Sequence, residues 1–382
     1  MNKERIAVPC TIMRGGTSKA IFMRMADVPS EPAARERFLL ALFGSPDKRQ
    51  IDGLGGADPL TSKFAMIGPA TRPDADIDYT FAQIGIEDAY VSYEIVCGNI
   101  SSATGVYAIE EGLVPAVEPV TTVRVHNTNT NSILIIKVPV RDGEVLIEGD
   151  FAIDGVPGTG AEVALDYSDT SGGATGRLLP TGNVRDSVQV PSLRRTLDVS
   201  IVDIGTICVY FRAEDLGMNG SELPGELPAE AYRAAEEIRL AAAALCGLPQ
   251  SGRGDITPFQ IMIAPPQGYA ALTGEAVKAD DIDFAARQIN VDGWMHKAFS
   301  GGASTCTAVA AQIEGTIPHE SSSVRTTPRG VRIGHPSGAL PIFAQVERDP
   351  RGAWVVREVH FSRTVRRLMD GTAYLLRSIL QD

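Results

Sequence analysis

The chain has 382 residues, of which 44% are hydrophobic, and a formal net charge of −12. This length predicts two domains, each able to bury a sizeable core. The acidic charge argues against nucleic acids and anionic membrane surfaces as partners, because both would repel the protein. The 38 glycines and 24 prolines predict many turns, as in a strand-rich protein.

The cysteines indicate the compartment. They are few, odd in number, widely spaced and without a CxxC pair: Cys10, Cys97, Cys208, Cys246 and Cys306. This pattern is typical of free thiols in a reducing compartment, so we expect a cytoplasmic protein. The N-terminus shows no signal-peptide segment, and no apolar run reaches the length of a membrane span. The five histidines lack metal-ligand spacing, so we expect no metal.

The first part of the chain predicts a hairpin, a helix and a glycine loop. Residues 6–23 alternate as two strands around Gly15 and Gly16, which permit positive φ and close approach to a ligand, or form a merely flexible turn. Residues 31–43 have helical spacing. A glycine-rich loop at 51–59 lacks the phosphate-loop motif and leads to Lys63, at the start of a strand. A lysine at such a junction is either solvated or functional.

The chain is organised around residues 97–103, which follow a strand-like run at 91–96 and precede an apolar-periodic segment. This order predicts a strand, a tight turn and a helix, with Cys97 and several backbone N–H groups at the helix N-terminus. Such a terminus attracts anions and favours thiolates. The alternative is a small buried cysteine at an ordinary turn.

An internal repeat favours the functional alternative. Five segment pairs recur in the same order at offsets of roughly 190 to 210 residues. They are 76–86 with 281–291, 109–115 with 313–318, 124–127 with 332–335, 63–69 with 259–265, and the hairpin turn with 203–206. The Cys97 turn then corresponds to residues 300–305. We therefore expect two helix N-termini, one in each half, to face each other across a cleft.

The repeat also predicts the domains. We expect residues 1–184 to form the first half and 185–360 the second, which carries its own alanine-rich helix at 231–245. Residues 361–382 are interpreted as an amphipathic helix that joins the first half, with Arg363, Arg366 and Arg367 on one side. Two helix N-termini in one cleft would bind a small polycarboxylate. Lys63 and Cys97 are the groups able to move a proton there.

Six motifs resemble the PrpF family, over essentially the whole chain: residues 13–19, 55–63, 97–101, 154–159, 181–183 and 334–338. The resemblance implies an α/β (α+β) diaminopimelate epimerase-like fold with two pseudo-symmetric halves, each a curved sheet around a central helix. It also implies cofactor-free 1,3-proton shifts in unsaturated di- or tricarboxylic acids. The family's reactions are methylaconitate cis-trans isomerisation, methylitaconate Δ-isomerisation and oxalomesaconate tautomerisation.

The resemblance also assigns residues. Lys63 stands where the family's proposed base stands, and Cys97 occupies the second active-site position. The positions expected to contact substrate are Thr17, Ser18, Ser62, Asn99, Ile100, Ser101, Ser300, Gly301 and Gly302. The family pattern does not choose among methylaconitate, methylitaconate, aconitate and oxalomesaconate.

One departure concerns the epimerase relatives, which have a cysteine at each helix N-terminus. Here the second turn carries Ser300, and Cys306 lies about one and a half helical turns further in. A symmetric two-cysteine racemase is therefore disfavoured. Two alternatives stay open: a racemase or epimerase acting at a carbon α to a carboxylate, and a carboxylate-binding protein without turnover. Exposed edge strands would also allow a homodimer.

Overall fold

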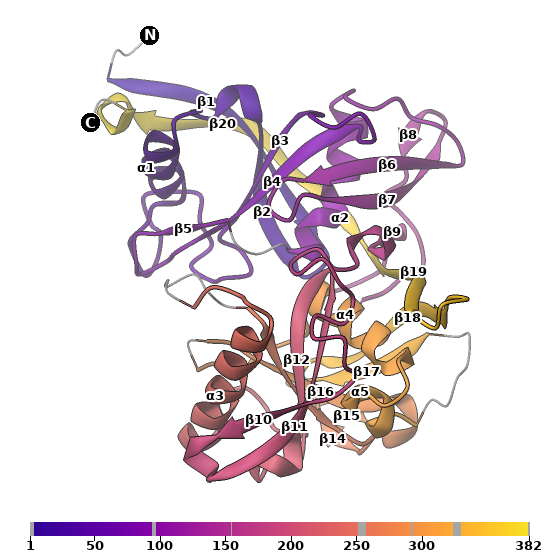
Figure 1. The fold of residues 1–382 in the computed structure, drawn as a ribbon. Coiled ribbons are helices and arrows are strands. Elements are labelled where there is room, and N and C mark those ends of the chain that lie inside the picture. Colours follow the sequence, from indigo (N-terminus) through magenta and orange to yellow (C-terminus); the bar gives the residue numbers. More distant parts are fainter. Residues whose placement is uncertain are drawn as a thin grey trace. The chain divides into compact units, whose positions relative to one another are not determined.

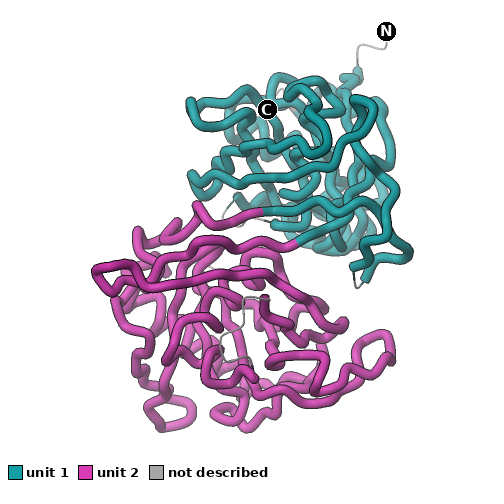
Figure 2. The backbone as a smooth tube through the Cα atoms, turned by 90° about the vertical axis from the view of Figure 1, so that its right-hand side faces the viewer, with its two compact units in different colours: residues 1–165, 362–382 teal, residues 166–361 magenta. Residues whose placement is uncertain are grey.

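The computed structural model describes residues 4–93, 97–153, 155–250, 257–291, 293–323 and 330–380. The chain divides into two compact units, coloured separately in Figure 2. Unit 1 comprises residues 1–165 and 362–382, and unit 2 comprises residues 166–361. Unit 2 is thus an insertion within unit 1. Residues 166–184, expected in the first half, lie in unit 2.

Unit 1 contains a mixed sheet with two principal helices (Figure 1). Its elements are β1 (Arg5–Gly15), β2 (Ser18–Arg24), α1 (Pro32–Phe43), β3 (Lys63–Pro69), β4 (Ile77–Ile84), β5 (Val91–Ser92), α2 (Gly98–Glu110), β6 (Val120–Asn127), β7 (Ser132–Arg141), β8 (Glu144–Val145), β9 (Val163–Asp166) and β20 (Val365–Leu376). Seven strands follow the order β20-β1-β2-β3-β4-β6-β7. The β2–β3 and β4–β6 pairs are parallel and the others antiparallel.

Helix α2 forms the centre of unit 1. Every residue from Gly98 to Ile109 is buried, and the helix contacts β1, β2, β3, β6, β7 and β20. A helix buried on all sides requires apolar or small residues throughout, which the sequence of α2 provides. The sheet therefore curves around α2, as the fold prediction expected.

Helix α1 covers the other face of the sheet. It begins after Glu31, whose carboxylate accepts hydrogen bonds from the backbone N–H groups of Ala33 and Ala34 at 3.0 and 2.6 Å. It ends at Gly44, which adopts a left-handed conformation (φ 73°). The core on this face includes Ile21, Met23, Phe38, Leu39, Leu42, Phe43, Phe64 and Met66. The predicted helix at 31–43 is confirmed.

Unit 2 repeats this plan. Its elements are β10 (Asp186–Val190), β11 (Arg195–Ile204), β12 (Thr206–Arg212), α3 (Ala229–Leu245), β13 (Phe259–Ala264), β14 (Tyr269–Ala270), β15 (Ala276–Val277), β16 (Phe284–Ile289), α4 (Gly301–Gln312), α5 (Ile317–Ser321), β17 (Val331–His335), β18 (Gly338–Arg348) and β19 (Trp354–Arg363), whose last two residues belong to unit 1. Helix α4 is buried from Gly301 to Ala311 and contacts β11, β12, β17 and β18. Helix α3 packs on the outer face, against β10, β12 and β13.

Strand registers relate the two units residue by residue. In unit 1, Ala20 of β2 pairs with Lys63 of β3 in a parallel arrangement. In unit 2, Cys208 of β12 pairs in the same way with Phe259 of β13. The predicted correspondence of 63–69 with 259–265 is confirmed, and the lysine of unit 1 is matched by a phenylalanine in unit 2.

One part of the repeat is out of register. Ile77 of β4 pairs with Val125 of β6, whereas Phe284 of β16 pairs with Ile333 of β17. Residues 76–79 therefore correspond to 283–286, and not to 281–284 as the sequence match predicted. The matching amino acids lie in different secondary structure, because residues 279–281 form a short 3-10 helix before β16.

The predicted C-terminal helix at 361–382 is wrong over the described residues. Residues 361–363 end β19, residues 365–376 form β20, and residues 377–380 form a short 3-10 helix. β20 pairs antiparallel with β1, from Arg5 beside Leu376 to Gly15 beside Val365. Local propensity favoured a helix, but pairing with a strand distant in sequence prevails. The three arginines consequently do not share a helix face.

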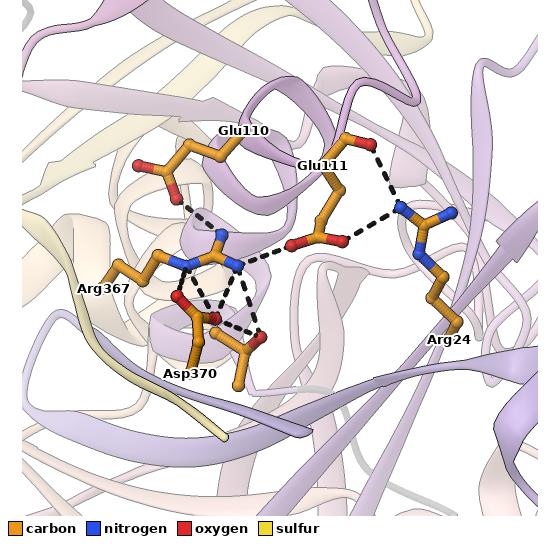
Figure 3. A network of polar contacts seen from close by, with 6 residues as sticks. Arg24, Glu110, Glu111, Arg367 and Asp370 are labelled. Carbon is orange, nitrogen blue, oxygen red and sulfur yellow. Dashed lines mark hydrogen bonds and ion pairs between the residues drawn. The ribbon is translucent and has the colours of Figure 1, made fainter. Parts of the chain in front are cut away.

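A charged network holds the C-terminal end of α2 (Figure 3). Arg367 of β20 contacts Glu110, Glu111 and Asp370 at 2.9, 2.5 and 2.6 Å, and Arg24 contacts Glu111 at 2.9 Å. Carboxylates at a helix C-terminus oppose the helix dipole, so the arginines offset an unfavourable arrangement. Partial burial disfavours ionisation of Glu111, but hydrogen bonds from Arg367 and Arg24 hold its pKa below its usual range. The network fixes α2 to β2 and β20.

Candidate active site

Lys63 lies on the face of the unit 1 sheet that α2 covers. Its strand partner, Ala20, is two residues after Ser18, so these three side chains point to one face. On the same face Phe22 contacts Tyr107 of α2, with ring centroids 5.3 Å apart. Because β2 and β3 are parallel, Ser18 and Lys63 both lie at the end of the sheet where these strands begin.

An uncharged neighbour positions the Lys63 amine. The Nζ atom donates to Oε1 of Gln83 at 2.6 Å and lies 5.4 Å from the ring centroid of Phe81. The Gln83 amide nitrogen donates to the carbonyls of Pro59 and Ser62 at 3.2 and 3.0 Å. Across the described ranges, no carboxylate forms an ion pair with Lys63. An amide oxygen accepts a hydrogen bond from a neutral or a charged amine, so this contact does not prevent Lys63 from exchanging a proton with a ligand.

Ser62 is directed to the glycine loop. Its hydroxyl donates to Oε1 of Gln50 at 2.7 Å, and the same oxygen accepts from the backbone N–H of Ala57 at 2.8 Å. The predicted glycine loop is therefore fastened to the start of β3. This contact fixes the backbone just before Lys63.

Cys97 precedes α2 as its N-cap residue. The Cys97 side chain makes no cap hydrogen bond, and the first helical bond runs from Ser101 N to Cys97 O at 2.8 Å. The Cys97 thiol lies 4.0 Å from the Ser18 hydroxyl. Lys63 and Cys97 thus approach the same end of the same sheet face. The N–H groups of the first turn carry the positive end of the helix dipole and can bind an anion.

The strand predicted at 91–96 is only partly described. Residues Val91–Ser92 form the short strand β5, and residues 94–96 lie outside the described ranges. The helix predicted after the cysteine is confirmed and begins directly at Gly98.

The hairpin turn packs directly against the first turn of α2. A Cβ atom on Gly15 would lie 2.1 Å from the Asn99 carbonyl oxygen, and Gly16 has φ 51°. The paired glycines therefore allow the turn to approach the helix closely. The sequence interpretation had instead explained them by close approach to a ligand or by a flexible turn. The Asn99 amide nitrogen donates to the Thr17 hydroxyl at 3.0 Å. Its Oδ1 atom accepts from Nε of Arg363 at 2.8 Å.

The remaining predicted residues of α2 face inward. Ile100 and Ser101 are fully buried, and the Ser101 hydroxyl donates to the Cys97 carbonyl at 3.0 Å. These two residues could therefore contribute to an anion site only through their backbone groups. Arg363 was missed as a site residue, because only an extended conformation at this position brings it to Asn99, 264 residues away in sequence.

Unit 2 carries a comparable helix N-terminus. Ser300 is the N-cap of α4 and makes no side-chain cap bond. Its hydroxyl is buried without a hydrogen-bond partner among the described residues. Gly302 packs beside Gly205 of the β11–β12 turn. Cys306 is fully buried and directs its thiol to the Val202 carbonyl at 3.2 Å, so it is a core residue.

The described residues contain neither a metal-binding cluster nor a membrane-spanning helix. No group of three or more His, Cys, Asp and Glu side chains there is arranged to hold a metal ion. None of the helices in those ranges is both long and apolar enough to cross a membrane.

Two units, each with a curved sheet around a buried helix, define the diaminopimelate epimerase-like class of α/β proteins. A hydroxyproline epimerase from Agrobacterium vitis shares this fold, with a TM-score of 0.57 and 13% identity over 98% of this chain and 93% of the epimerase. Within this class, the chain belongs to the PrpF family, described as PrpF protein, which it matches over residues 5–376.

Relatives in this family are named as isomerases. A 3-methylitaconate isomerase of Eubacterium barkeri is 43% identical, covering 97% of this chain and 98% of the relative. A (4E)-oxalomesaconate Delta-isomerase of Novosphingobium sp. is 38% identical (97% and 98%), and a 2-methyl-aconitate isomerase of Shewanella oneidensis is 36% identical (96% and 96%). The crystal structure of a methylitaconate-delta-isomerase superposes with a TM-score of 0.84 at 42% identity, over 99% of this chain and 98% of that chain. The predicted enzyme class, isomerase, is confirmed.

Proposed function

We propose that this protein moves or re-forms a C=C double bond in an unsaturated di- or tricarboxylic acid by a cofactor-independent 1,3-proton shift. The candidate substrates are methylitaconate, 2-methylaconitate, aconitate and 4-oxalomesaconate, and the names of the relatives support this class. The observation that carries the proposal is the convergence of Lys63 and Cys97. Supporting it, Lys63 begins β3 at the end of the sheet face where the Cys97 thiol approaches Ser18, and Cys97 is the N-cap residue of α2.

In the proposed reaction, the unprotonated Lys63 amine removes a proton from the carbon allylic to the double bond. The electron pair left behind delocalises over the allyl system into the adjacent carboxylate, giving a dienolate-like anion. Backbone N–H groups of Gly98, Asn99 and Ile100 stabilise this charge, in the manner of an oxyanion hole. Lys63 or Cys97 then protonates the other end of the allyl system, so the product has the atoms of the substrate.

Substrate carboxylates require donors besides those of α2. We assign this role to the hydroxyl groups of Thr17 and Ser18 in unit 1, and to the turn of Ser300, Gly301 and Gly302 in unit 2. The supporting observation in unit 2 is the uncapped N-terminus of α4 with the unpartnered Ser300 hydroxyl among the described residues.

Proton NMR in D₂O tests the reaction. The enzyme is incubated separately with trans-aconitate, 2-methylaconitate, methylitaconate and 4-oxalomesaconate. A new isomer with deuterium at the allylic position establishes the 1,3-shift and identifies the substrate. Deuterium exchange without a new isomer favours an epimerase-like reaction. Binding without exchange favours a receptor for carboxylates. Either result would overturn the proposed double-bond shift.

A Lys63→Met variant tests the base. We expect at least a ~100-fold loss of kcat, the usual scale for a general base. Lys48→Met removes the same charge at an exposed position and is the matched control. Near-full activity in Lys63→Met would remove this lysine from the mechanism.

A symmetric racemase is less well supported than the isomerase. Such an enzyme needs a proton-transferring group from each half, and the positions equivalent to Lys63 and Cys97 in unit 2 are Phe259 and Ser300. Phenylalanine cannot exchange a proton. The asymmetry of the two units therefore favours proton transfer by groups of unit 1.

We further propose a cytoplasmic, dimeric protein. All five cysteines are free thiols, which supports a reducing compartment. Strand β20 pairs with β1 and exposes apolar side chains at Leu368, Met369, Tyr374 and Leu376, which supports self-association. Light scattering at several concentrations would show a monomer if the dimer proposal is wrong.

A further inference from the structure

The predicted substrate-binding hydroxyls are connected to a buried arginine that the sequence motifs did not mark. Arg363 is 5% exposed and donates from Nε to Oδ1 of Asn99 at 2.8 Å. The Asn99 amide nitrogen faces the Thr17 hydroxyl at 3.0 Å and the Ser18 hydroxyl at 3.5 Å. These contacts form a continuous chain of hydrogen bonds from a guanidinium to two hydroxyl groups, which we call the relay.

The chain has a fixed direction. An arginine can only donate hydrogen bonds, so the oxygen of the Asn99 amide must face Arg363 and the NH₂ group must face the turn. The Thr17 oxygen therefore accepts from Asn99, and the Ser18 oxygen accepts from both Asn99 and the Cys97 thiol. With the acceptor side occupied, each hydroxyl hydrogen is directed away from Asn99.

We propose that Arg363 is a positioning residue: by orienting the Asn99 amide, it commits the Thr17 and Ser18 hydroxyl groups to donate to a substrate carboxylate. A carboxylate only accepts, so it binds hydroxyls whose hydrogens are available. This inference rests on the proposed function for the identity of the ligand, and it specifies how the turn selects an anion over a neutral group.

Other contacts hold the backbone of the turn, so the relay can be removed separately. The Arg14 guanidinium donates to the carbonyls of Gly16 and Thr364 at 3.0 and 2.9 Å. The Gly16 N–H donates to the same Thr364 carbonyl at 3.0 Å. Loss of the Arg363 guanidinium should therefore leave the turn in place while freeing the Asn99 amide to rotate.

Two variants interrupt the relay in different ways. Arg363→Met removes the donors and retains an extended side chain. Asn99→Asp keeps the shape and the contact with Arg363, but a carboxylate accepts on both sides and draws the hydroxyl hydrogens to itself. Arg366→Met, at an exposed position on β20, controls for the loss of one positive charge. Thermal unfolding confirms that each variant is folded.

The readouts are the Kd of propane-1,2,3-tricarboxylate, which is saturated and cannot isomerise, by calorimetry, and kcat and KM by NMR. We expect both relay variants to raise Kd and KM by roughly 10–100-fold, the scale of one charge-assisted hydrogen bond, with a smaller change in kcat. The control should keep the wild-type Kd.

A double-mutant cycle separates positioning from simple stabilisation. In a Thr17→Val, Ser18→Ala background the relay has no hydroxyls to orient, so Arg363→Met should change Kd by less than ~3-fold. An undiminished effect in that background, or a wild-type Kd in both relay variants, overturns the inference. A wild-type protein that binds the tricarboxylate but isomerises no acid refutes the proposed function, while Kd still decides the relay. A wild-type protein with neither binding nor turnover overturns both.

Discussion

The Arg367 network provides a stability prediction that depends on pH. Replacing Arg367 by methionine keeps the apolar stem and removes the contacts with Glu110, Glu111 and Asp370 shown in Figure 3. The arginine is 21% exposed and Asp370 is 59% exposed, so solvent screens these pairs. At about 0.2–1 kcal/mol for each such pair, the three contacts contribute about 1–2 kcal/mol to the free energy of unfolding.

The sign of the pH dependence follows from the carboxylates. Hydrogen bonds from Arg367 hold the pKa of Asp370 below its usual range, and those from Arg367 and Arg24 do so for Glu111 against the effect of burial. A group with a depressed folded-state pKa stabilises the fold above its unfolded value, near about 4, and loses this contribution as the pH falls through the folded value. The cost of Arg367→Met should therefore be largest at pH 7 and shrink below about pH 4.

Urea unfolding of wild type, Arg367→Met and the exposed control Arg366→Met at pH 7 and at pH 3.5 measures this dependence. At pH 7 we also expect Tm to fall by roughly 2–8 °C. A loss of the same size at both pH values would attribute the effect to packing of the arginine stem. A loss equal to that of the control would refute a specific role for the network.

Three further predictions concern the site. Gly15→Ala places a methyl group against the first turn of α2; we expect a loss of about 1–3 kcal/mol in urea unfolding, and wild-type stability would contradict the close approach. Gln83→Leu removes the acceptor that positions Lys63; kcat should fall ~10-fold with little change in KM, and an unchanged kcat would show that the contact is dispensable. Iodoacetamide should modify Cys97 before Cys246, whose pKa burial raises to about 11, and a bound tricarboxylate should slow the reaction at Cys97 alone; mass spectrometry of the labelled peptides checks both.

Short-range signals in the sequence predicted the first hairpin and the two outer helices. The hairpin glycines, the proline and glycine that bound residues 31–43, and the alanine-rich run at 231–245 all mark structure within a few residues. The first buried helix followed from the local order around Cys97, and the second from the internal repeat. The fold class was implied by the family resemblance, and the motifs that carry this resemblance also marked Lys63 and Cys97.

The contacts that complete the site could not be predicted in this way. Arg363 reaches Asn99 only because residues 361–376 are extended and β20 pairs with β1. Leucine, methionine and arginine in this segment favour a helix when considered alone. The partnership of Lys63 with Gln83 likewise depends on the β3–β4 register, which no single segment encodes.

The pairing of β1 with β20 has a consequence for synthesis of the protein on the ribosome. Unit 2, residues 166–361, emerges before β20, and domains generally fold as they are completed. Unit 2 can therefore fold while β1 still lacks β20, one of its two neighbours, and α2 lacks part of its cover. Arg363 and Arg367 arrive only at this late stage, so a nascent chain would complete the proposed anion site after most of its architecture is already in place.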